Sequence, residues 1–189
     1  MKAGSITKGI YLVWNNEPVL VVDKEFFNPG KGAAVVRLKL KNVKTGNVVK
    51  QVLRTDEPVQ EIFVENKKAQ FMYQDQENFV FVDPKTFEQL EVSAKLIGED
   101  KYYMLPEETY RITIYNDEPV GVVLPLKMIF EIVETESGAK GDTVTSAMKD
   151  AVLQTGLEVK VPLFIKKGER IIVSTQTGEY VARADKGDS

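Results

Sequence analysis

The sequence predicts an all-β fold made of small β-barrels, on two observations. Short alternating or β-branched runs recur along all 189 residues, and polar, turn-forming residues separate them. Many short strands with regular turns are typical of barrels. Within residues 111–115 the polar and apolar positions alternate, as a half-buried strand requires. Only residues 87–96 indicate a short helix, with Thr86 as its candidate N-cap.

The expected strands follow one another in chain order. They cover residues 10–14, 19–27, 34–40, 48–53, 69–73, 79–82, 110–115, 120–124, 127–133, 157–161, 170–174 and 179–182. Polar or glycine-containing turns lie between many of them, at 15–16, 45–46, 75–78, 116–117, 167–168 and 177–178. Residues 14–22 also resemble residues 115–123, both having the order strand, polar turn, strand. We favour shared hairpin chemistry over duplication of a whole domain as the explanation, since Asn and Asp tolerate left-handed turns. The resemblance also suggests two separate β units.

Composition excludes several kinds of chemistry. The chain has no cysteine and no histidine, which excludes disulfides, catalytic thiolates, Ser-His-Asp triads and histidine-ligated zinc. A carboxylate-dependent hydrolase or a Mg²⁺ enzyme remains open, although no spacing of carboxylates points to one. The first residues lack the apolar core of a signal peptide, and no apolar run approaches the roughly 18 residues of a membrane span. We therefore expect a cytoplasmic binding protein without a metal or cofactor.

The segment from Asn28 to Ala33 places one lysine between glycines: Asn-Pro-Gly-Lys-Gly-Ala. A strand-like run enters this segment and another leaves it, which predicts a β-hairpin with Lys31 at its tip. Pro29 suits the entry to a turn, and Gly30 and Gly32 permit a positive φ and place no side chains beside the lysine. No helix follows, so this is not a phosphate-binding loop. The loop by itself also fits an ordinary solvated turn.

Charge is distributed unevenly along the chain. Residues 1–64 contain 10 Lys and Arg against 6 Asp and Glu, a net charge of +4, although the whole chain carries −3. Residues 65–126 carry −6 and residues 127–189 carry −1. A basic first third suits a polyanion, whose phosphates provide most of the sequence-independent affinity in nucleic-acid binding. A solvated strand face is the simpler explanation of the same charges.

Three stretches resemble the bacterial elongation factor P family. The first is Pro29 to Ala34 with 36–40 and Thr45-Gly46, and the second is 79–83. The third comprises 141–143, 155–165, 168–169 and 175–183. These stretches occur in the family's order over essentially the whole chain. The sequence departs from the family pattern at 145–152, at Gln154 and at Ser174.

The resemblance implies a fold. Residues 1–64 would form an SH3-like or KOW-like barrel, and residues 65–126 and 127–189 would each form an OB-fold barrel. The family's shape is an elongated L that resembles a tRNA. Its eukaryotic and archaeal relative is initiation factor five-A.

The resemblance also implies a function. The family is not enzymatic, and its members bind the ribosome between the peptidyl-tRNA (P) and exit (E) sites and relieve stalling at consecutive prolines. Lys31 would contact the CCA end of the peptidyl-tRNA, and in many members that lysine is extended by a modifying enzyme. The expected partners are both ribosomal subunits, peptidyl-tRNA and mRNA, bound by a monomer. A general OB-fold module for RNA or single strands is the alternative function.

Further residues acquire candidate roles from the resemblance. Gly141, Asp142 and Thr143 would lie near the messenger RNA codon, although their small-residue loop also fits a linker between strands. Tyr180 and Arg183 would contact the small subunit by stacking on a base and holding a phosphate, or would simply be one buried and one exposed strand residue. Arg37 and Lys39 are candidate contacts to tRNA phosphates, and strand alternation alone would also place both on one exposed face.

Overall fold

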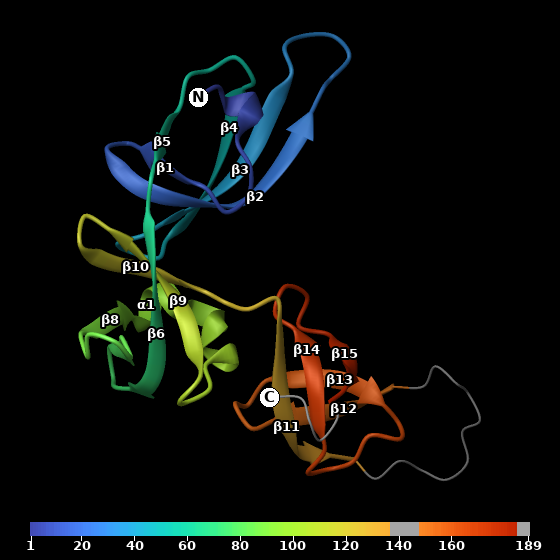
Figure 1. Ribbon diagram of the computed structural model, residues 1–189. Helices are drawn as coiled ribbons and strands as arrows, with labels where there is room; N and C mark the ends of the chain where they lie inside the picture. The colour runs from blue at the N-terminus through green and yellow to red at the C-terminus, as the bar shows by residue number, and fades with distance from the viewer. Residues whose placement is uncertain (137–147, 185–189) are drawn as a thin grey trace. The chain divides into compact units, whose positions relative to one another are not determined.

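The structure is a computed structural model that describes residues 1–136 and 148–184, and it confirms the all-β prediction (Figure 1). In this described part the strands form three five-stranded sheets. The chain divides into two compact units. One contains Met1–Gly98 and Arg111–Val122, and the other contains Glu99–Tyr110 and the residues from Val123 onward. The domain boundaries proposed after residues 64 and 126 stay a prediction, although each sheet draws its strands from one of the three predicted ranges.

The first sheet has the strand order β4-β3-β2-β1-β5. Its elements are η1 (Ala3–Ser5), β1 (Tyr11–Trp14), β2 (Glu17–Phe27), β3 (Val35–Asn42), β4 (Val48–Arg54) and β5 (Gln60–Ile62). β5 was not among the predicted strands, because a strand of three residues is too short for alternation to be visible. The longest strand, β2, pairs antiparallel with both β1 and β3 and therefore links the two halves of the sheet.

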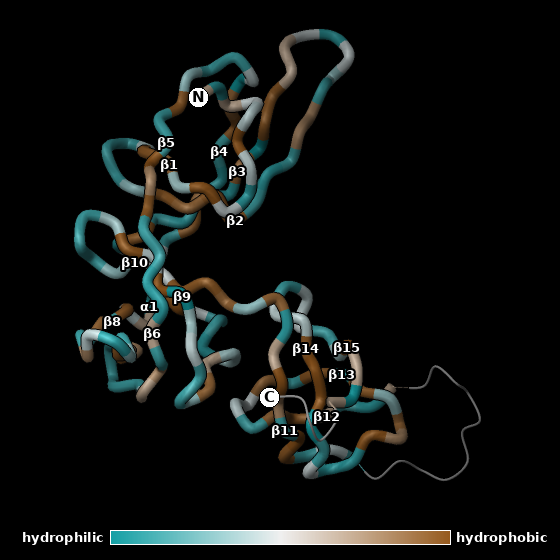
Figure 2. The backbone as a smooth tube through the Cα atoms, in the orientation of Figure 1, coloured by the Kyte–Doolittle hydropathy of each residue, from teal (hydrophilic) through white to brown (hydrophobic). Residues whose placement is uncertain are grey.

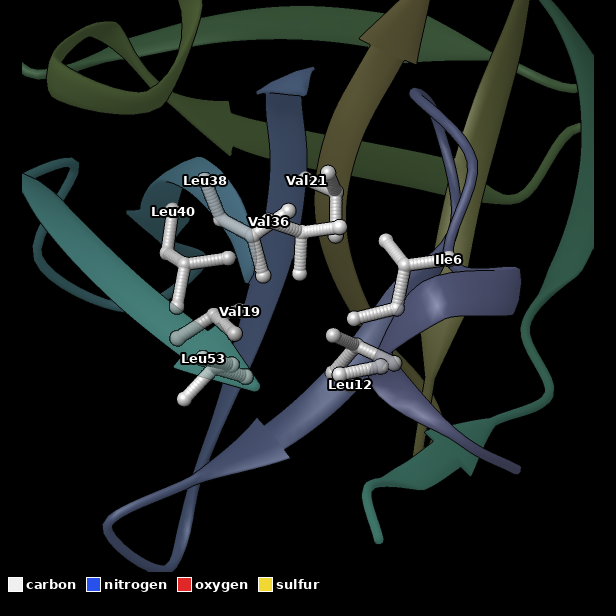
Figure 3. Packing of buried hydrophobic residues seen from close by; sticks show 9 residues of the cluster. Ile6, Leu12, Val19, Val21, Val36, Leu38, Leu40 and Leu53 are labelled. Atoms are coloured by element: carbon white, nitrogen blue, oxygen red, sulfur yellow. The ribbon is translucent and has the colours of Figure 1, made fainter. Parts of the chain in front are cut away.

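The core of the first sheet follows from alternation along its strands. In β3, Val36, Leu38 and Leu40 are buried, whereas Arg37 and Lys39 between them are exposed. Figure 3 shows these three side chains gathered with residues from β1, β2, β4 and the N-terminal segment: Leu12, Val19, Val21, Leu53 and Ile6. Each fully buried aliphatic side chain contributes about 1.5–3 kcal/mol. This cluster holds β2 and β3 in one fixed register below the hairpin tip.

The second sheet has the order β10-β9-β6-β7-β8. Its strands are β6 (Glu65–Gln74), β7 (Asn78–Val82), β8 (Gln89–Ser93), β9 (Thr109–Tyr115) and β10 (Glu118–Val123), with α1 (Ala94–Ile97) and η2 (Gly98–Tyr103) after β8. Three phenylalanines pack in its core. The Phe71 ring centroid lies 5.6 Å from that of Phe79 and 5.4 Å from that of Phe81.

The helix predicted for residues 87–96, with Thr86 as its N-cap, was wrong in its bounds and its cap, because only the last three residues of that range are helical, in α1. Asp83 Oδ1 accepts the backbone N–H groups of Lys85 and Thr86, and Phe87 has a φ of +58°, so these residues form a turn. The strand β8 follows and pairs with β7, and the short α1 begins only after Ser93, whose Oγ accepts the Lys95 N–H. Pairing with a neighbouring strand therefore overrides the local helical pattern.

The third sheet has the order β13-β12-β11-β14-β15. Its strands are β11 (Lys127–Thr135), β12 (Met148–Leu153), β13 (Glu158–Pro162), β14 (Arg170–Ser174) and β15 (Tyr180–Arg183). β12 was not among the predicted strands, because a charged residue occupies one of its inward positions. Lys149 is buried with Ala151 and Leu153, and its Nζ donates to the Glu136 carbonyl oxygen at 2.8 Å. The long lysine stem thus occupies an apolar position while its ammonium finds a backbone acceptor.

The repeated segment forms two equivalent hairpins. β1 joins β2 through Asn15 and Asn16, and β9 joins β10 through Asn116 and Asp117; all four residues have φ between +51° and +64°. Both turns are hydrophilic in Figure 2. Two consecutive positive φ values match the tight turn whose twist suits a hairpin. The interpretation of the repeat as shared hairpin chemistry is consistent with this geometry.

Candidate functional site

The hairpin predicted around Lys31 is present. β2 and β3 pair antiparallel up to Phe27 opposite Val35, and the loop between them extends away from the rest of the first sheet (Figure 1). The Thr55 N–H donates to the Ala34 carbonyl oxygen at 3.1 Å, which ties the returning arm of the loop to the end of β4. Residues 28–33 are exposed and form the free part of the hairpin.

The glycines beside Lys31 are required by conformation. Gly30 has a φ of +74° and Gly32 a φ of +113°, values that other residues adopt only with strain. A Cβ on Gly30 would meet nothing within 4 Å, so crowding inside the loop is not the constraint there. The Gly30 N–H donates to Asn28 Oδ1 at 3.3 Å, and this contact shapes the entry to the turn together with Pro29. The arrangement presents the Lys31 ammonium with only hydrogen atoms as side chains on either side.

Lys24 anchors the outgoing strand of the hairpin, a role that was not predicted from the sequence. Its partly buried Nζ donates to the carbonyl oxygens of Gly4 at 2.8 Å and Ile6 at 2.6 Å. These bonds fasten the N-terminal segment to β2 seven positions before the tip. A lysine in a basic region gives no sequence signal for such a role, because its acceptors belong to the backbone of a distant segment.

Arg37 and Lys39 lie on one exposed face of β3, as alternation predicted, and both form ion pairs. Arg37 Nη1 lies 3.5 Å from Glu25 Oε2, and Lys39 Nζ lies 3.3 Å from Asp23 Oδ2. The hydrogen bond and charge of Lys39 hold the pKa of Asp23 below its ordinary value. The Arg37 guanidinium also lies 4.7 Å from the centroid of the Phe27 ring.

Glu25, Asp23 and Phe27 were not predicted as partners of Arg37 and Lys39, although the sequence contains a signal for the two carboxylates. A hairpin centred on Lys31 pairs residues that are equally distant from it, namely 6 positions for Glu25 and Arg37 and 8 for Asp23 and Lys39. Opposite charges at directly facing positions are favourable cross-strand pairs. The centre of the turn therefore predicts the pairing.

Tyr180 and Arg183 lie on the last strand of the third sheet, in the other compact unit. An irregularity in β15 places Tyr180 opposite Val173 and Arg183 opposite Ile171. Since facing residues of paired strands share a side of the sheet, the irregularity brings both side chains to one side despite their odd spacing. Tyr180 is half-buried, and Arg183 Nη1 lies 3.7 Å from Glu169 Oε1. Gly141, Asp142 and Thr143 lie outside the described residues.

Two further features concern chemistry and membranes. Within residues 1–136 and 148–184, no three Asp or Glu side chains cluster closely enough to hold a metal ion. Over the same residues, no helix has the length and apolarity needed to cross a bilayer.

Comparison with known proteins places the whole chain in one family. Three family models match: the elongation factor P KOW-like domain over residues 2–59, its OB domain over 64–122 and its C-terminal domain over 128–183. Elongation factor P of Treponema denticola is 44% identical over 185 residues, covering 98% of this chain and 99% of its own. The protein of the same name from Thermosipho africanus is 39% identical over 181 residues, and the match covers 96% of this chain and 98% of the relative.

Among solved structures, the eukaryotic translation initiation factor 5A from Methanococcus jannaschii is 21% identical with a TM-score of 0.44. The match covers 65% of this chain and 92% of the chain in that structure. The three family models and the relatives, which match along nearly the whole length, establish the relationship. The chain belongs to the elongation factor P family.

Proposed function

We propose that this chain is a translation elongation factor that binds the ribosome between the P and E sites. There it stimulates peptide-bond formation where consecutive prolines stall synthesis. Family membership over the whole chain supports the role in translation elongation. The observation that carries the finer proposal is the projecting hairpin with the exposed Lys31 between two glycines. The factor acts as a cytoplasmic monomer.

Positioning explains how such a factor could help without catalytic groups of its own. Proline is a poor nucleophile in this setting because its nitrogen is constrained by the ring. A misplaced peptidyl-tRNA also loses the orientation on which the reaction rate depends. A cation brought to the CCA end on a thin loop can hold the phosphates and restore that orientation. The ribosome then performs the chemistry, and this chain needs neither histidine nor cysteine.

Lysine suits the tip for two reasons. Its ammonium is a compact charge on a flexible four-carbon stem, and its amine can be extended covalently by a modifying enzyme. Sugar attachment to arginine, used by some relatives, does not apply to a lysine. The intact mass of the protein purified from its native cell decides whether Lys31 carries an addition, and a mass equal to the bare chain excludes it for that preparation.

The other candidate contacts complete the proposal. Arg37 and Lys39 bind phosphates of the peptidyl-tRNA, and Tyr180 and Arg183 contact the small subunit. Gly141, Asp142 and Thr143 contact messenger RNA near the exit-site codon.

Replacing the tip lysine tests the proposal. In a reconstituted translation system with a polyproline reporter, we expect the wild-type protein to relieve stalling and Lys31→Ala to lose most of this effect. Lys44→Ala, also exposed and in the first sheet's β3–β4 turn, is the matched control and should retain activity. Rescue by Lys31→Ala equal to wild type would contradict the role of the tip.

The alternative, a general RNA-binding module, predicts a different binding preference. We expect tight binding to ribosomes and weak binding to free single-stranded RNA. Strong binding to bare single strands with no preference for ribosomes would favour the alternative.

A further inference from the structure

The basic residues of the hairpin face are not freely available to a phosphate. Lys39 and Arg37 stand directly opposite Asp23 and Glu25 in the β2–β3 register, and both pairs are within ion-pair distance, 3.3 and 3.5 Å. The four side chains are between 48% and 65% exposed. The face is therefore open to solvent and to a partner, but it is locally balanced in charge.

The position of Lys39 shows what Asp23 prevents. On the side of β3 away from β2, Lys39 faces the exposed Lys50 of the neighbouring strand β4. Without Asp23 these two lysines would form an uncompensated pair of like charges on neighbouring strands. Such a pair is a general attractor for polyanions, because each lysine that neutralises a phosphate releases condensed counterions.

Arg37 is constrained in a second way. Its guanidinium lies over the Phe27 ring at 4.7 Å while one nitrogen reaches Glu25. Phe27 is 41% exposed, so one part of its ring is covered and the rest faces solvent. These two contacts favour one orientation of the guanidinium, in which it is already engaged with a carboxylate and a ring.

Exposed ion pairs contribute little to stability, so a partner can break them. A phosphate held at the right place replaces each carboxylate with a comparable contact. A flexible single strand has to lose conformational freedom to supply two phosphates at this spacing, whereas a folded RNA already presents them. The carboxylates therefore weaken the binding of disordered RNA more than the binding of structured RNA.

We propose that Asp23 and Glu25 are specificity residues that keep Lys39 and Arg37 from binding disordered RNA and yield them to phosphates of a folded RNA. The inference rests on the proposed function, in which that folded RNA is a ribosome-bound tRNA.

The test is the double variant Asp23→Asn/Glu25→Gln, which removes both charges and keeps the side-chain shapes. The amide oxygen introduced at position 23 can still accept the Lys24 N–H, as Asp23 Oδ1 does now. The readout is the affinity for a labelled single-stranded uridine-rich RNA, measured against salt, beside the affinity for ribosomes. We expect the affinity for single strands to rise about 3- to 30-fold at low salt. The slope of the logarithm of the binding constant against the logarithm of salt concentration should become steeper by about one to one and a half. Ribosome affinity should change about threefold or less.

A matched control separates position from net charge. Glu88→Gln/Asp150→Asn also removes two exposed carboxylates from ion pairs, those with Lys67 and Lys160, and changes net charge equally. We expect this variant to bind single strands nearly as wild type does. An equal rise in both double variants, or no rise in Asp23→Asn/Glu25→Gln, would overturn the inference.

A single variant and the polyproline assay separate failure of the inference from failure of the proposed function. If the double variant unfolds on a thermal melt, Glu25→Gln alone carries the test, with about half the expected logarithmic shift. Failure of wild-type protein to relieve polyproline stalling would count against the proposed function and leave the single-strand result standing. A normal polyproline activity with unchanged single-strand affinity would count against the inference alone.

Discussion

At the scale of single residues, several side chains fasten the backbone by direct bonds to main-chain atoms. Lys24 does so in β2 of the first sheet, and Tyr110 does so in β9 of the second. The Tyr110 hydroxyl donates to the Tyr103 carbonyl oxygen and accepts from the Leu105 N–H, both at 2.8 Å. Tyr110 is 1% exposed, so neither backbone group has water as an easy substitute. Removing one partner of such a bond destabilises the fold strongly, because the other buried group is left without a hydrogen bond.

Tyr110→Phe is therefore expected to lower the free energy of unfolding by about 1–3 kcal/mol, because it leaves a buried amide and a carbonyl unpaired. Urea unfolding at neutral pH measures this. Tyr73→Phe, at a residue 55% exposed, is the control and should change stability by less than about 0.5 kcal/mol. Equal stabilities for the two variants would show that the Tyr110 hydroxyl bonds contribute nothing.

The same tyrosine predicts a dependence on alkaline pH. Burial raises the pKa of Tyr110 from 10.0 to about 12. Because the folded protein holds this proton more tightly than the unfolded chain, the contribution is complete below pH 10.0 and is lost as the pH rises toward about 12. Between those values the stability of wild type should fall more steeply than that of Tyr110→Phe, in unfolding curves recorded at successive pH values. Parallel curves would contradict the assignment.

At the scale of elements, the turn between β3 and β4 packs closely against α1. Lys41 Nζ donates to the Leu96 carbonyl oxygen at 2.5 Å, and a Cβ on Gly46 would lie 2.7 Å from the Lys95 carbonyl oxygen. Gly46 also has a φ of +75°. This glycine is therefore needed both for its conformation and for the close approach of the helix backbone.

Gly46→Ala should destabilise the protein more than Gly9→Ala does. Both glycines have a positive φ, so both alanines incur the left-handed penalty of about 1–2 kcal/mol. Only Gly46 adds a backbone clash, worth about 1–3 kcal/mol more, since a Cβ on Gly9 meets nothing within 4 Å. Denaturant midpoints of the two variants give the difference. Equal losses would mean that the turn and α1 separate without cost.

Secondary structure was predictable where one face of a strand is apolar and the other polar. β3 follows this pattern and was placed within about two residues, the usual uncertainty of an end. β9 was placed as closely because its residue types alternate, although its polar Thr113 is also buried, at 1% exposed. β12 was missed because Lys149 takes an inward position, and residues 87–96 were misassigned because only pairing with β7 selects the strand. Local sequence does not contain either contact.

At the scale of the whole molecule, the chain has two compact units, and each contains fully buried apolar side chains. Leu38 lies in the core of the first unit and Ile132 in the core of the second, 1% and 0% exposed. Units with their own cores can unfold as separate transitions.

Leu38→Ala and Ile132→Ala should therefore affect different transitions in a calorimetric scan. Each substitution removes buried methyl groups and costs its own unit about 2–5 kcal/mol. We expect Leu38→Ala to shift one transition and Ile132→Ala to shift the other, while the exposed Val181→Ala shifts neither. A single transition that both core variants move together would show that the two units unfold as one.

The sequence by itself determined the fold class, the family and the hairpin centred on Lys31. These depend on alternation, turn residues and residue order, all of which are local properties of the chain. It also placed Arg37 and Lys39 correctly on one exposed face of their strand.

Only the tertiary structure decided how those residues are engaged. It showed that Asp23 and Glu25 pair with Lys39 and Arg37, that Lys24 bonds to backbone carbonyls near the N-terminus, and that the irregular β15 brings Tyr180 and Arg183 to one side. The physical reason is that each contact joins groups from different strands or segments. Their meeting depends on register and on backbone position, which a pattern within one strand does not specify.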